Sequence, residues 1–381
     1  MRLGGLFTAI LVAALWSVAP AGADVSGPFE TSAGPVRVER VAGPFDHPWA
    51  IAFLPKPGTF LVTERSGTLR VVRDGSISAP VRGVPPVLAR GQGGLLDVVL
   101  DPDFARTSRI FLTFSEPVQG GRRGRTALAT GLFRDDGGAP RLEDVEVIFR
   151  QEPALGGSRH FGSRIVFSDD GKLYLTLGDR GSRDNVQDLS NHLGKVIRLN
   201  LDGSVPSDNP FVGQDGVRPE IWSYGHRNPQ GAAKRPSDGA YFTISHGAGG
   251  GDEVNRPKPG KNFGWPEVSY GTHYSGRPFP AATRADVEPP LHYWDPSIAP
   301  SGAAFYDGDL FPEWKGDLFV GALRYELISR LDVDGDRVSE AERLFEDEFG
   351  RIRDVRVGPE GALWFATDDD EGGIYRILPA R

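Results

Sequence analysis

A single histidine stands between glycines in the stretch Gly156–Phe167, which reads GGSRHFGSRIVF. The alternating residues after His160 predict a strand that enters a hydrophobic core. Glycines on both sides permit unusual backbone turns and leave room for a flat group to approach the main chain. These surroundings suit a general base beneath a planar cofactor. The alternative is a loop histidine that makes only a structural hydrogen bond.

Two further segments carry cations in constrained positions. Arg227 and Asn228 lie between Gly225 and the run PQG, and Arg227 could either stabilise negative charge or pair with a nearby acid in a turn. Arg351 and Arg353 stand immediately before a predicted strand. Their forked guanidinium groups suit carboxylate partners, although solvated charges at a strand end are the alternative.

Oxygen-rich segments indicate where a hard cation could bind. Gly247 and Ala248 offer main-chain carbonyls, and Asp252 and Glu253 follow with carboxylates; these are the ligands that Ca²⁺ takes. The run 332–336, DVDGD, resembles the start of a calcium loop but has Arg343 where the closing glutamate belongs, so it predicts a turn between strands. The run 368–370, DDD, predicts a solvated turn.

The first 23 residues predict a secretory signal peptide. They combine Arg2, an apolar run and a small-residue end at Ala21–Ala23, which predicts cleavage after Ala23. A membrane anchor is the alternative, but the apolar run contains Ser17, is followed by Pro20 and is short for a bilayer span. We therefore expect a periplasmic or secreted protein without a membrane span.

Composition narrows the class of protein. The formal net charge is −8 and no basic run is present, which argues against nucleic acid as a partner. There are no cysteines, so disulfides and thiolate metal sites are impossible. The 50 glycines and 31 prolines are dispersed among apolar alternation, which indicates many turns in a folded chain.

A repeated pattern of strand, short turn and strand organises the chain. A third strand follows in most units, and such a unit buries both faces only when it is repeated around an axis. We therefore expect an all-β protein, a six-bladed β-propeller of four-stranded antiparallel blades, over residues 24–381, with a long inserted loop around 256–300. The alternating segment Val36–Val41 is expected to complete the last blade and close the ring. The six units are centred on residues 49–63, 95–114, 165–177, 233–244, 303–320 and 355–366.

Seven ordered motifs spread over the predicted mature chain carry a resemblance. The chain resembles soluble, pyrroloquinoline quinone (PQQ)-dependent sugar dehydrogenases, in the aldose sugar dehydrogenase branch of the glucose/sorbosone dehydrogenase family. The motifs are GQGGLL at 91–96, the His160 stretch, GHRNPQG at 225–231, HGA at 246–248 with GGDEVN at 250–255, NFGWP at 262–266, GALR at 321–324 and RIRDV at 351–355.

The resemblance implies a function and a set of site residues. It implies an exported oxidoreductase that oxidises aldoses at C1 to lactones, with PQQ and Ca²⁺ as cofactors and an external electron acceptor. His160 would be the base, and Arg227 would stabilise charge on the quinone. The implied quinone-binding residues are Gln92, Arg227, Asn228, Ala322, Leu323, Arg324, Arg351 and Arg353. The implied calcium ligands are the carbonyls of Gly247 and Ala248, and, for a second ion, the Glu253 side chain and the Phe263 carbonyl.

Departures from the family pattern bear on the substrate. Arg159 stands where related glucose dehydrogenases carry an aspartate that can touch the sugar, Gly249 replaces an often basic residue, and Arg324 stands where lysine is common. Contacts to glucose are therefore not transferred to this chain. Two other functions are compatible with a propeller. One is a calcium-dependent lactonase in which His160 activates water. The other is a sugar-binding module without catalysis, in which exposed Trp and Tyr residues of the 256–300 loop stack on sugars. We expect a monomer or weak dimer.

Overall fold

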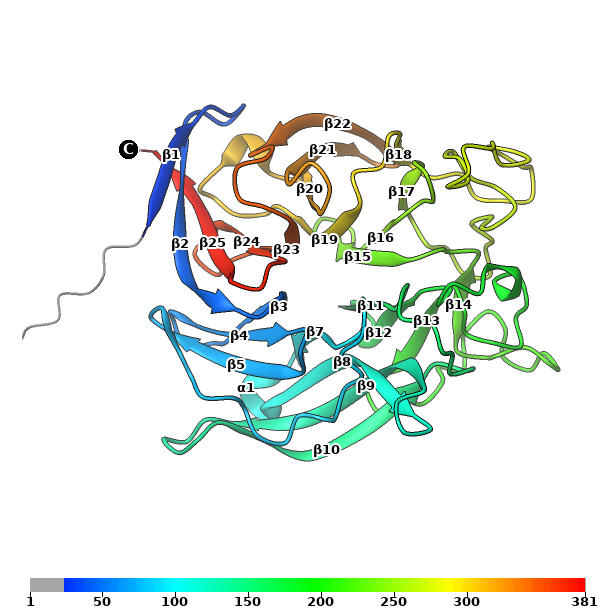
Figure 1. Ribbon diagram of the computed structural model, residues 1–381, viewed down its shortest axis with the longest axis horizontal. Coiled ribbons are helices and arrows are strands. Elements are labelled where there is room, and N and C mark those ends of the chain that lie inside the picture. Colours follow the sequence, from blue (N-terminus) through cyan, green and yellow to red (C-terminus); the bar gives the residue numbers. More distant parts are fainter. Residues whose placement is uncertain (1–23, 381) are drawn as a thin grey trace, which may run out of the picture.

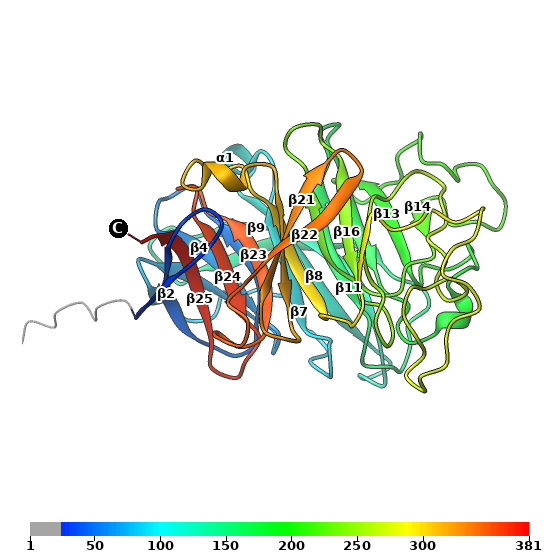
Figure 2. The same ribbon diagram turned by 90° about the horizontal axis from the view of Figure 1, so that it is seen from above.

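Six antiparallel sheets surround a central axis in the computed structural model, which describes residues 24–380 (Figure 1). The predicted six-bladed propeller is therefore confirmed. Figure 2 shows the same ring edge-on, with the strands crossing its thickness. The predicted signal peptide, residues 1–23, lies outside the described residues. Within residues 24–380, no helix is long and apolar enough to span a bilayer. The described helical elements are α1 (Phe104–Thr107), η1 (Arg183–Asn185) and η2 (Pro312–Trp314).

Each blade begins at the axis and proceeds outward. The first three blades are β3 (Pro48–Phe53), β4 (Thr59–Glu64), β5 (Thr68–Arg73) and β6 (Ser76–Ile77); β7 (Leu95–Leu100), β8 (Arg109–Val118), β9 (Arg123–Arg134) and β10 (Arg141–Arg150); and β11 (Gly162–Phe167), β12 (Lys172–Leu177), β13 (Lys195–Asn200) and β14 (Ile221–Tyr224). The next two are β15 (Pro229–Lys234), β16 (Tyr241–Ser245), β17 (Asp252–Asn255) and β18 (His292–Trp294); and β19 (Pro300–Phe305), β20 (Leu318–Ala322), β21 (Ile328–Asp334) and β22 (Arg337–Leu344).

The sixth blade joins the two ends of the described chain. It contains β23 (Ile352–Val357), β24 (Leu363–Thr367), β25 (Gly372–Pro379) and β2 (Val36–Phe45), and β1 (Val25–Phe29) adds a fifth strand. The register pairs Val38 with Ile377. The predicted closing strand is therefore confirmed, and it is longer than the Val36–Val41 segment. Closure of this kind removes the free edges that an open ring of sheets would leave.

Packing between neighbouring blades forms the core. Trp364 of the sixth blade lies edge-on to Phe53 and Phe60 of the first, at centroid distances of 5.1 and 5.3 Å. Such pairs stabilise the contact beyond the apolar area they bury, by roughly 0.5–1.5 kcal/mol each. The alternating apolar residues of each strand thus bury both faces of each blade against its neighbours.

Buried ion pairs tie the innermost strands together. Arg164 on β11 lies 3.2 Å from Asp97 on β7 and 3.0 Å from Asp354 on β23, and Arg356 lies 2.9 Å from both carboxylates. Two cations and two anions balance one another, so the charges are compensated inside the protein. Loss of one partner would leave an unpaired buried charge, which typically costs about 3–5 kcal/mol.

Two regions outside the strand pattern affect the site. The run 332–336 spans the end of β21 and the turn of its hairpin with β22: Gly335 and Asp336 form the turn, and Asp334 pairs with Arg337. The predicted connection between strands is confirmed. Between β17 and β18, residues 256–291 contain no strand. The segment carries Trp265 and Tyr274 to the cavity described below.

Candidate active site

The predicted site residues converge because of blade topology. The innermost strands, β3, β7, β11, β15, β19 and β23, pack on one another around the axis. His160 precedes β11, Arg227 and Asn228 precede β15, and Arg351 precedes β23. Turns after the second strand of a blade reach the same end because that strand is antiparallel to the first. Asp179, Gly247 and Leu323 follow β12, β16 and β20 in this way.

His160 occupies a strained and well-anchored position. Its φ is +58°, in the left-handed region that side-chain-bearing residues seldom adopt. The His160 N–H donates to Gln92 Oε1 at 2.7 Å, and its carbonyl accepts from the Arg180 N–H at 3.2 Å. A Cβ on Gly178 would lie 2.1 Å from that carbonyl oxygen, so only glycine there allows the close approach. Predicted site residue Gln92 therefore positions the His160 backbone.

A carboxylate fixes the orientation of the His160 ring. His160 Nδ1 lies 2.6 Å from Asp179 Oδ1. Asp179 also accepts hydrogen bonds from the Gly181 N–H at 2.7 Å and from Trp265 Nε1 at 2.9 Å. Because Nδ1 carries the proton toward this carboxylate, Nε2 is the free base in the neutral ring. The arrangement matches the orienting acid of a base dyad.

The surroundings keep the His160 ring neutral. Burial lowers the pKa of His160, the hydrogen bond to Asp179 raises it, and the positive charge of Arg227 lowers it again; the net pKa lies below the ordinary value. Burial would raise the pKa of Asp179, but the hydrogen bonds from His160 and from the Gly181 N–H hold it below its usual value. A neutral imidazole beside an ionised carboxylate is the state that a general base requires.

Arg227 presents a positive charge without a carboxylate partner in the described part of the chain. It is 6% exposed. It donates to the His246 carbonyl at 3.4 Å and to Tyr274 Oη at 2.9 Å, and its Cζ lies 5.3 Å from the Trp265 ring. The alternative of an arginine paired with an acid in a turn is therefore wrong. Its charge is available to a bound group in which negative charge develops.

A site that binds an ortho-quinone should offer hydrogen-bond donors that no protein group already uses. Asn228 is buried; its Oδ1 accepts from the Gly162 N–H at 3.2 Å, whereas its Nδ2 has no hydrogen-bond partner among the described residues. Buried donors are rarely left unpaired. Asn228 follows Arg227 in the chain but is not among the residues that line the cavity; the chemistry of its free donor suits a carbonyl oxygen, such as that of a quinone.

The three predicted carboxylate-binding arginines differ in their surroundings. Arg353 is buried, lies 2.5 Å from Asp368 Oδ2 and donates to Gln230 Oε1 at 2.6 Å. Arg351 is exposed and donates to the Leu323 carbonyl at 3.0 Å. Arg324 is also exposed, with its Cζ 4.9 Å from the Tyr325 ring. Arg324 and Arg351 thus have more free donor capacity for a bound carboxylate than Arg353.

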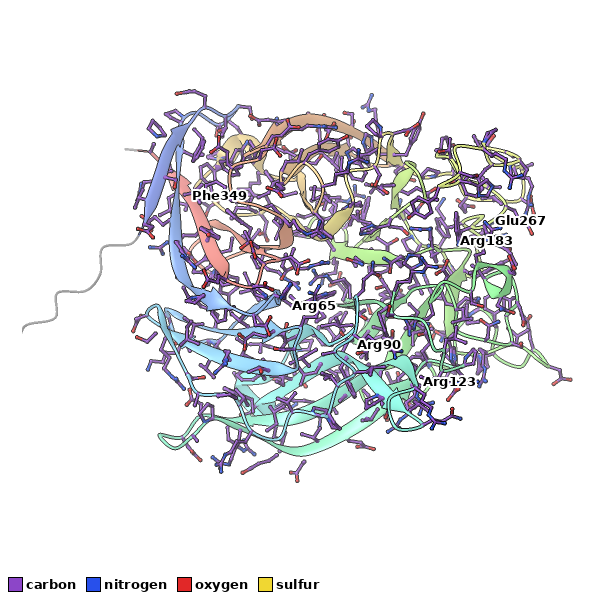
Figure 3. The ribbon with its side chains drawn as sticks, viewed as in Figure 1. Arg65, Arg90, Arg123, Arg183, Glu267 and Phe349 are labelled. Atoms are coloured by element: carbon purple, nitrogen blue, oxygen red, sulfur yellow. The ribbon has the colours of Figure 1, made fainter. Side chains whose placement is uncertain are left out.

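Asp368 corrects one sequence expectation. The run 368–370 was expected to be a solvated turn, yet Asp368 is 7% exposed. Burial opposes its ionisation, but Arg353 and Arg65 lower its pKa to about 2. Arg65 lies near the centre of the ring (Figure 3), with Nη1 3.5 Å from Asp368. Asp368 is therefore an internal counter-ion of the axial arginines.

The Gly247–Ala248 loop presents main-chain carbonyls in a tight turn. A Cβ on Gly247 would lie 2.1 Å from the Gly250 carbonyl oxygen. The Gly247 N–H donates to Asp252 at 2.8 Å, and Asp252 also accepts from Ser297 and the Ala299 N–H. Asp252 therefore holds the turn, whereas the carbonyls of Gly247 and Ala248 suit a hard cation.

Glu253 and Phe263 line a second, smaller cavity of about 130 Å³. Burial raises the pKa of Glu253 to about 7, although the Asn255 amide donates to it at 2.9 Å. No cation lies within salt-bridge distance of this carboxylate in residues 24–380. A desolvated carboxylate that shares a cavity with Phe263 is a suitable start for an oxygen-ligated ion.

One cavity unites the chemically active residues. It has a volume of about 430 Å³, and His160, Asp179, Arg227, Trp265 and Tyr274 line it, together with Arg159, Gly181, Ser182, Arg183, Asp184, Ala248 and His273. This volume falls within the ~300–1,000 Å³ typical of small-molecule sites. Arg183, one of the lining residues, is labelled in Figure 3.

The sequence did not identify Asp179 as a site residue, and it indicated Trp265 only through the NFGWP motif and Tyr274 only as one of the aromatic residues of the 256–300 loop. Asp179 lies in the run GDRG, between glycines as His160 does, directly after a predicted strand. That parallel could have identified it. The contacts of Trp265 and Tyr274 with the site depend on the path of a long irregular segment, so the sequence could not place either side chain beside His160.

Comparisons with known proteins agree with this site. A sequence profile of the Glucose / Sorbosone dehydrogenase family matches residues 45–376. Aldose sugar dehydrogenase YliI of Escherichia coli K12 is 46% identical over 90% of this chain and 93% of its own. The crystal structure of the soluble aldose sugar dehydrogenase from E. coli, in the apo form, superposes with a TM-score of 0.87 and 46% identity over 91% of this chain and 100% of that one.

A third relative was solved with a ligand. The PQQ-bound aldose sugar dehydrogenase from Streptomyces coelicolor has a TM-score of 0.74 and 28% identity, over 94% of this chain and 99% of that one. The profile match covers most of the chain, and the E. coli relative is similar over nearly its whole length. The chain belongs to the glucose/sorbosone dehydrogenase family.

Proposed function

We propose that this chain is a PQQ-dependent aldose sugar dehydrogenase, which oxidises an aldose at C1 to the lactone. One observation carries the proposal: a neutral His160 oriented by Asp179 shares a cavity with Arg227, a cation without a carboxylate partner in the described residues. Family membership and the PQQ-bound relative support the choice of cofactor.

The proton is handled by His160. With Nδ1 hydrogen-bonded to Asp179, Nε2 accepts the proton of the C1 hydroxyl as the C1 hydride departs. Asp179 stabilises the imidazolium that forms, and Trp265 holds the far oxygen of Asp179 in place. Two electrons and the hydrogen leave C1 as hydride, the hydroxyl proton goes to His160, and the sugar becomes a lactone.

The quinone supplies the hydride acceptor when it is bound. Arg227 places positive charge where negative charge arises on the acceptor side. Asn228 would donate a hydrogen bond from its unpaired Nδ2. Arg324, Arg351 and Arg353 would bind the carboxylates of the quinone. Ala322 and Leu323 lie at the end of β20 beside these arginines. Gln92 holds the His160 backbone in place.

Calcium would bind at two places. The carbonyls of Gly247 and Ala248 would hold an ion that increases the electrophilicity of the quinone. Glu253 and the Phe263 carbonyl would hold a second ion, with a structural role. The ligand sets are oxygen only, as Ca²⁺ prefers.

The proposed setting is the periplasm or the outside of the cell, reached through the signal peptide predicted at residues 1–23. An external electron acceptor would reoxidise the cofactor there. We propose a monomer or weak dimer.

Reconstitution tests the function. Purified protein is mixed with PQQ and Ca²⁺, and dye reduction is followed with a panel of aldoses while the lactone is quantified. We expect saturable reduction that requires both cofactors. Lactone hydrolysis by the quinone-free protein would instead favour a lactonase, and sugar binding without either reaction would favour a binding module.

A further inference from the structure

An aromatic residue from the long β17–β18 segment reaches over the catalytic cavity. Tyr274 is 76% exposed, although its hydroxyl accepts a hydrogen bond from buried Arg227 at 2.9 Å. Its ring centroid lies 5.8 Å from the Arg227 Cζ. A large aromatic face that is open to solvent at the mouth of a cavity is poorly explained by packing.

A short hairpin, residues 272–279 and called the arm below, holds Tyr274 there. The His273 N–H donates to the Arg277 carbonyl at 2.8 Å, and the Gly276 N–H donates to the His273 carbonyl at 2.8 Å. The ring of His273 lies 3.9 Å from that of Phe279, which is buried against Trp265 at 5.4 Å. The arm is thus packed on a side chain that also contacts Asp179.

The arm is also attached to the Gly247–Ala248 loop. The Gly249 N–H donates to the Thr272 carbonyl at 2.7 Å, and the Thr272 N–H and Oγ1 both donate to the Gly249 carbonyl, at 3.4 and 3.1 Å. Gly249 follows Ala248 directly. The position of Tyr274 is therefore fixed relative to the loop proposed to hold calcium.

The groups that line the cavity divide into two chemical kinds. Arg159, Asp184 and Arg183 carry charged groups that can hydrogen-bond to hydroxyls, and Arg183 Nη1 lies 3.5 Å from His273 Nδ1 of the arm. Tyr274 supplies a flat apolar face. A pyranose ring has the same division, with hydroxyl groups around its edge and apolar C–H groups on its faces, and such faces stack on aromatic rings.

We propose that Tyr274 is the sugar-binding platform of this chain, on which the pyranose ring of the aldose stacks while its C1 hydroxyl faces His160. The proposal rests on the proposed function and adds the residue that recognises the ring. The Tyr274 ring contributes to substrate binding. Its hydroxyl, as an acceptor for Arg227, positions a residue that acts in the chemical step.

Three variants separate these two contributions. Tyr274→Phe keeps the ring and removes the hydroxyl, so we expect KM for glucose within about twofold of wild type and a kcat about threefold lower. Tyr274→Ala removes both, so we expect the same loss in kcat and a KM raised about tenfold. Ser275→Ala is the matched control, because Ser275 is the exposed neighbour on the same turn and lies outside the cavity lining.

Quinone affinity is measured for each variant by the absorbance change on titration. We expect Tyr274→Ala to leave it within about twofold of wild type, which distinguishes lost sugar binding from a collapsed cofactor site. A KM for Tyr274→Ala equal to that of wild type would overturn the proposal. So would a KM increase that Ser275→Ala reproduces.

Calorimetric titration with glucose tests the platform independently of turnover. If wild-type protein neither binds PQQ nor reduces dye, the proposed function fails, and the titration is made on the quinone-free protein. Binding that weakens about tenfold in Tyr274→Ala would then still support the platform. Absence of glucose binding to wild type, or equal binding by the two proteins, would overturn it.

Discussion

His160 Nδ1 lies 2.6 Å from Asp179 Oδ1, and the other oxygen of Asp179 accepts a hydrogen bond from the Trp265 indole at 2.9 Å. This relationship connects a residue before β11, a residue after β12 and a residue of the β17–β18 segment. It determines which ring nitrogen is the base.

Replacement of Asp179 changes both the rate and the pH profile. In Asp179→Asn the amide group faces hydrogen-bond donors of His160, Gly181 and Trp265 and can accept from only one side. The His160 tautomer is then no longer fixed, and we expect kcat to be about a hundredfold lower. The Asp179 carboxylate raises the pKa of His160, so its loss moves the acid limb of kcat/KM to lower pH. The pH profile from 4 to 8 measures this shift. A shift to higher pH would contradict the assigned contact.

Replacement of Arg227 is expected to shift the same limb in the opposite direction. The charge of Arg227 lowers the pKa of His160, so Arg227→Gln moves the acid limb of kcat/KM to higher pH. We expect kcat to fall about a hundredfold because stabilisation of developing negative charge is lost. Steady-state kinetics over the same pH range provide the measurement. An unchanged kcat would show that Arg227 does not act in the chemical step.

The calcium-free protein is expected to lose stability as the pH rises. Burial raises the pKa of Glu253 from 4.5 to about 7, so the neutral carboxyl is favoured in the fold. Its contribution is complete below about pH 4.5 and is lost as the pH rises through about 7, by up to about 3 kcal/mol. Ca²⁺ prefers the carboxylate and should restore stability above pH 7.

Urea denaturation at pH 5 to 8, with chelator or with Ca²⁺, measures this effect. Glu253→Gln should remove both the pH dependence and the calcium gain assigned to this site. Glu267→Gln is the control, because Glu267 is a half-exposed acid of the segment that follows β17, and its replacement should leave both unchanged. Equal stabilisation of wild type and Glu253→Gln by Ca²⁺ would rule out Glu253 as a ligand.

The axial arginines should differ in their importance for the quinone. Arg324 and Arg351 are exposed, whereas Arg353 is paired with Asp368. We expect Arg324→Gln and Arg351→Gln each to raise the Kd for PQQ about tenfold, less at high ionic strength. Arg353→Gln should chiefly reduce the free energy of unfolding, because Asp368 loses its closest cation. Titration by absorbance and urea denaturation separate these effects. A normal Kd in both exposed variants would contradict the carboxylate assignment.

The sequence predicts the ring well because its signals are local. Period-two alternation and glycine or proline turns identify the six strand pairs and the closing strand Val36–Val41. Antiparallel topology then places His160, Arg227 and Arg351 at the same end of the axis. The clustering of the motifs can therefore be predicted although the distances between them cannot.

The contacts between these segments could not be predicted. Asp368 is next to two exposed acidic residues, and only its approach to Arg353 makes it a buried counter-ion. Tyr274 is placed by hydrogen bonds between Gly249 and Thr272, across a segment without periodicity. Such long-range pairings depend on tertiary packing, which local propensity does not encode.

The central claim is that His160 is the base of a quinone-dependent oxidation. The most direct measurement compares wild type with His160→Ala in PQQ binding and in glucose-dependent dye reduction, in the presence of Ca²⁺. The predicted result is a Kd for PQQ within about twofold of wild type, near one quinone per chain, and a kcat at least about a thousandfold lower. Turnover retained in His160→Ala, or PQQ binding lost along with activity, would contradict the account.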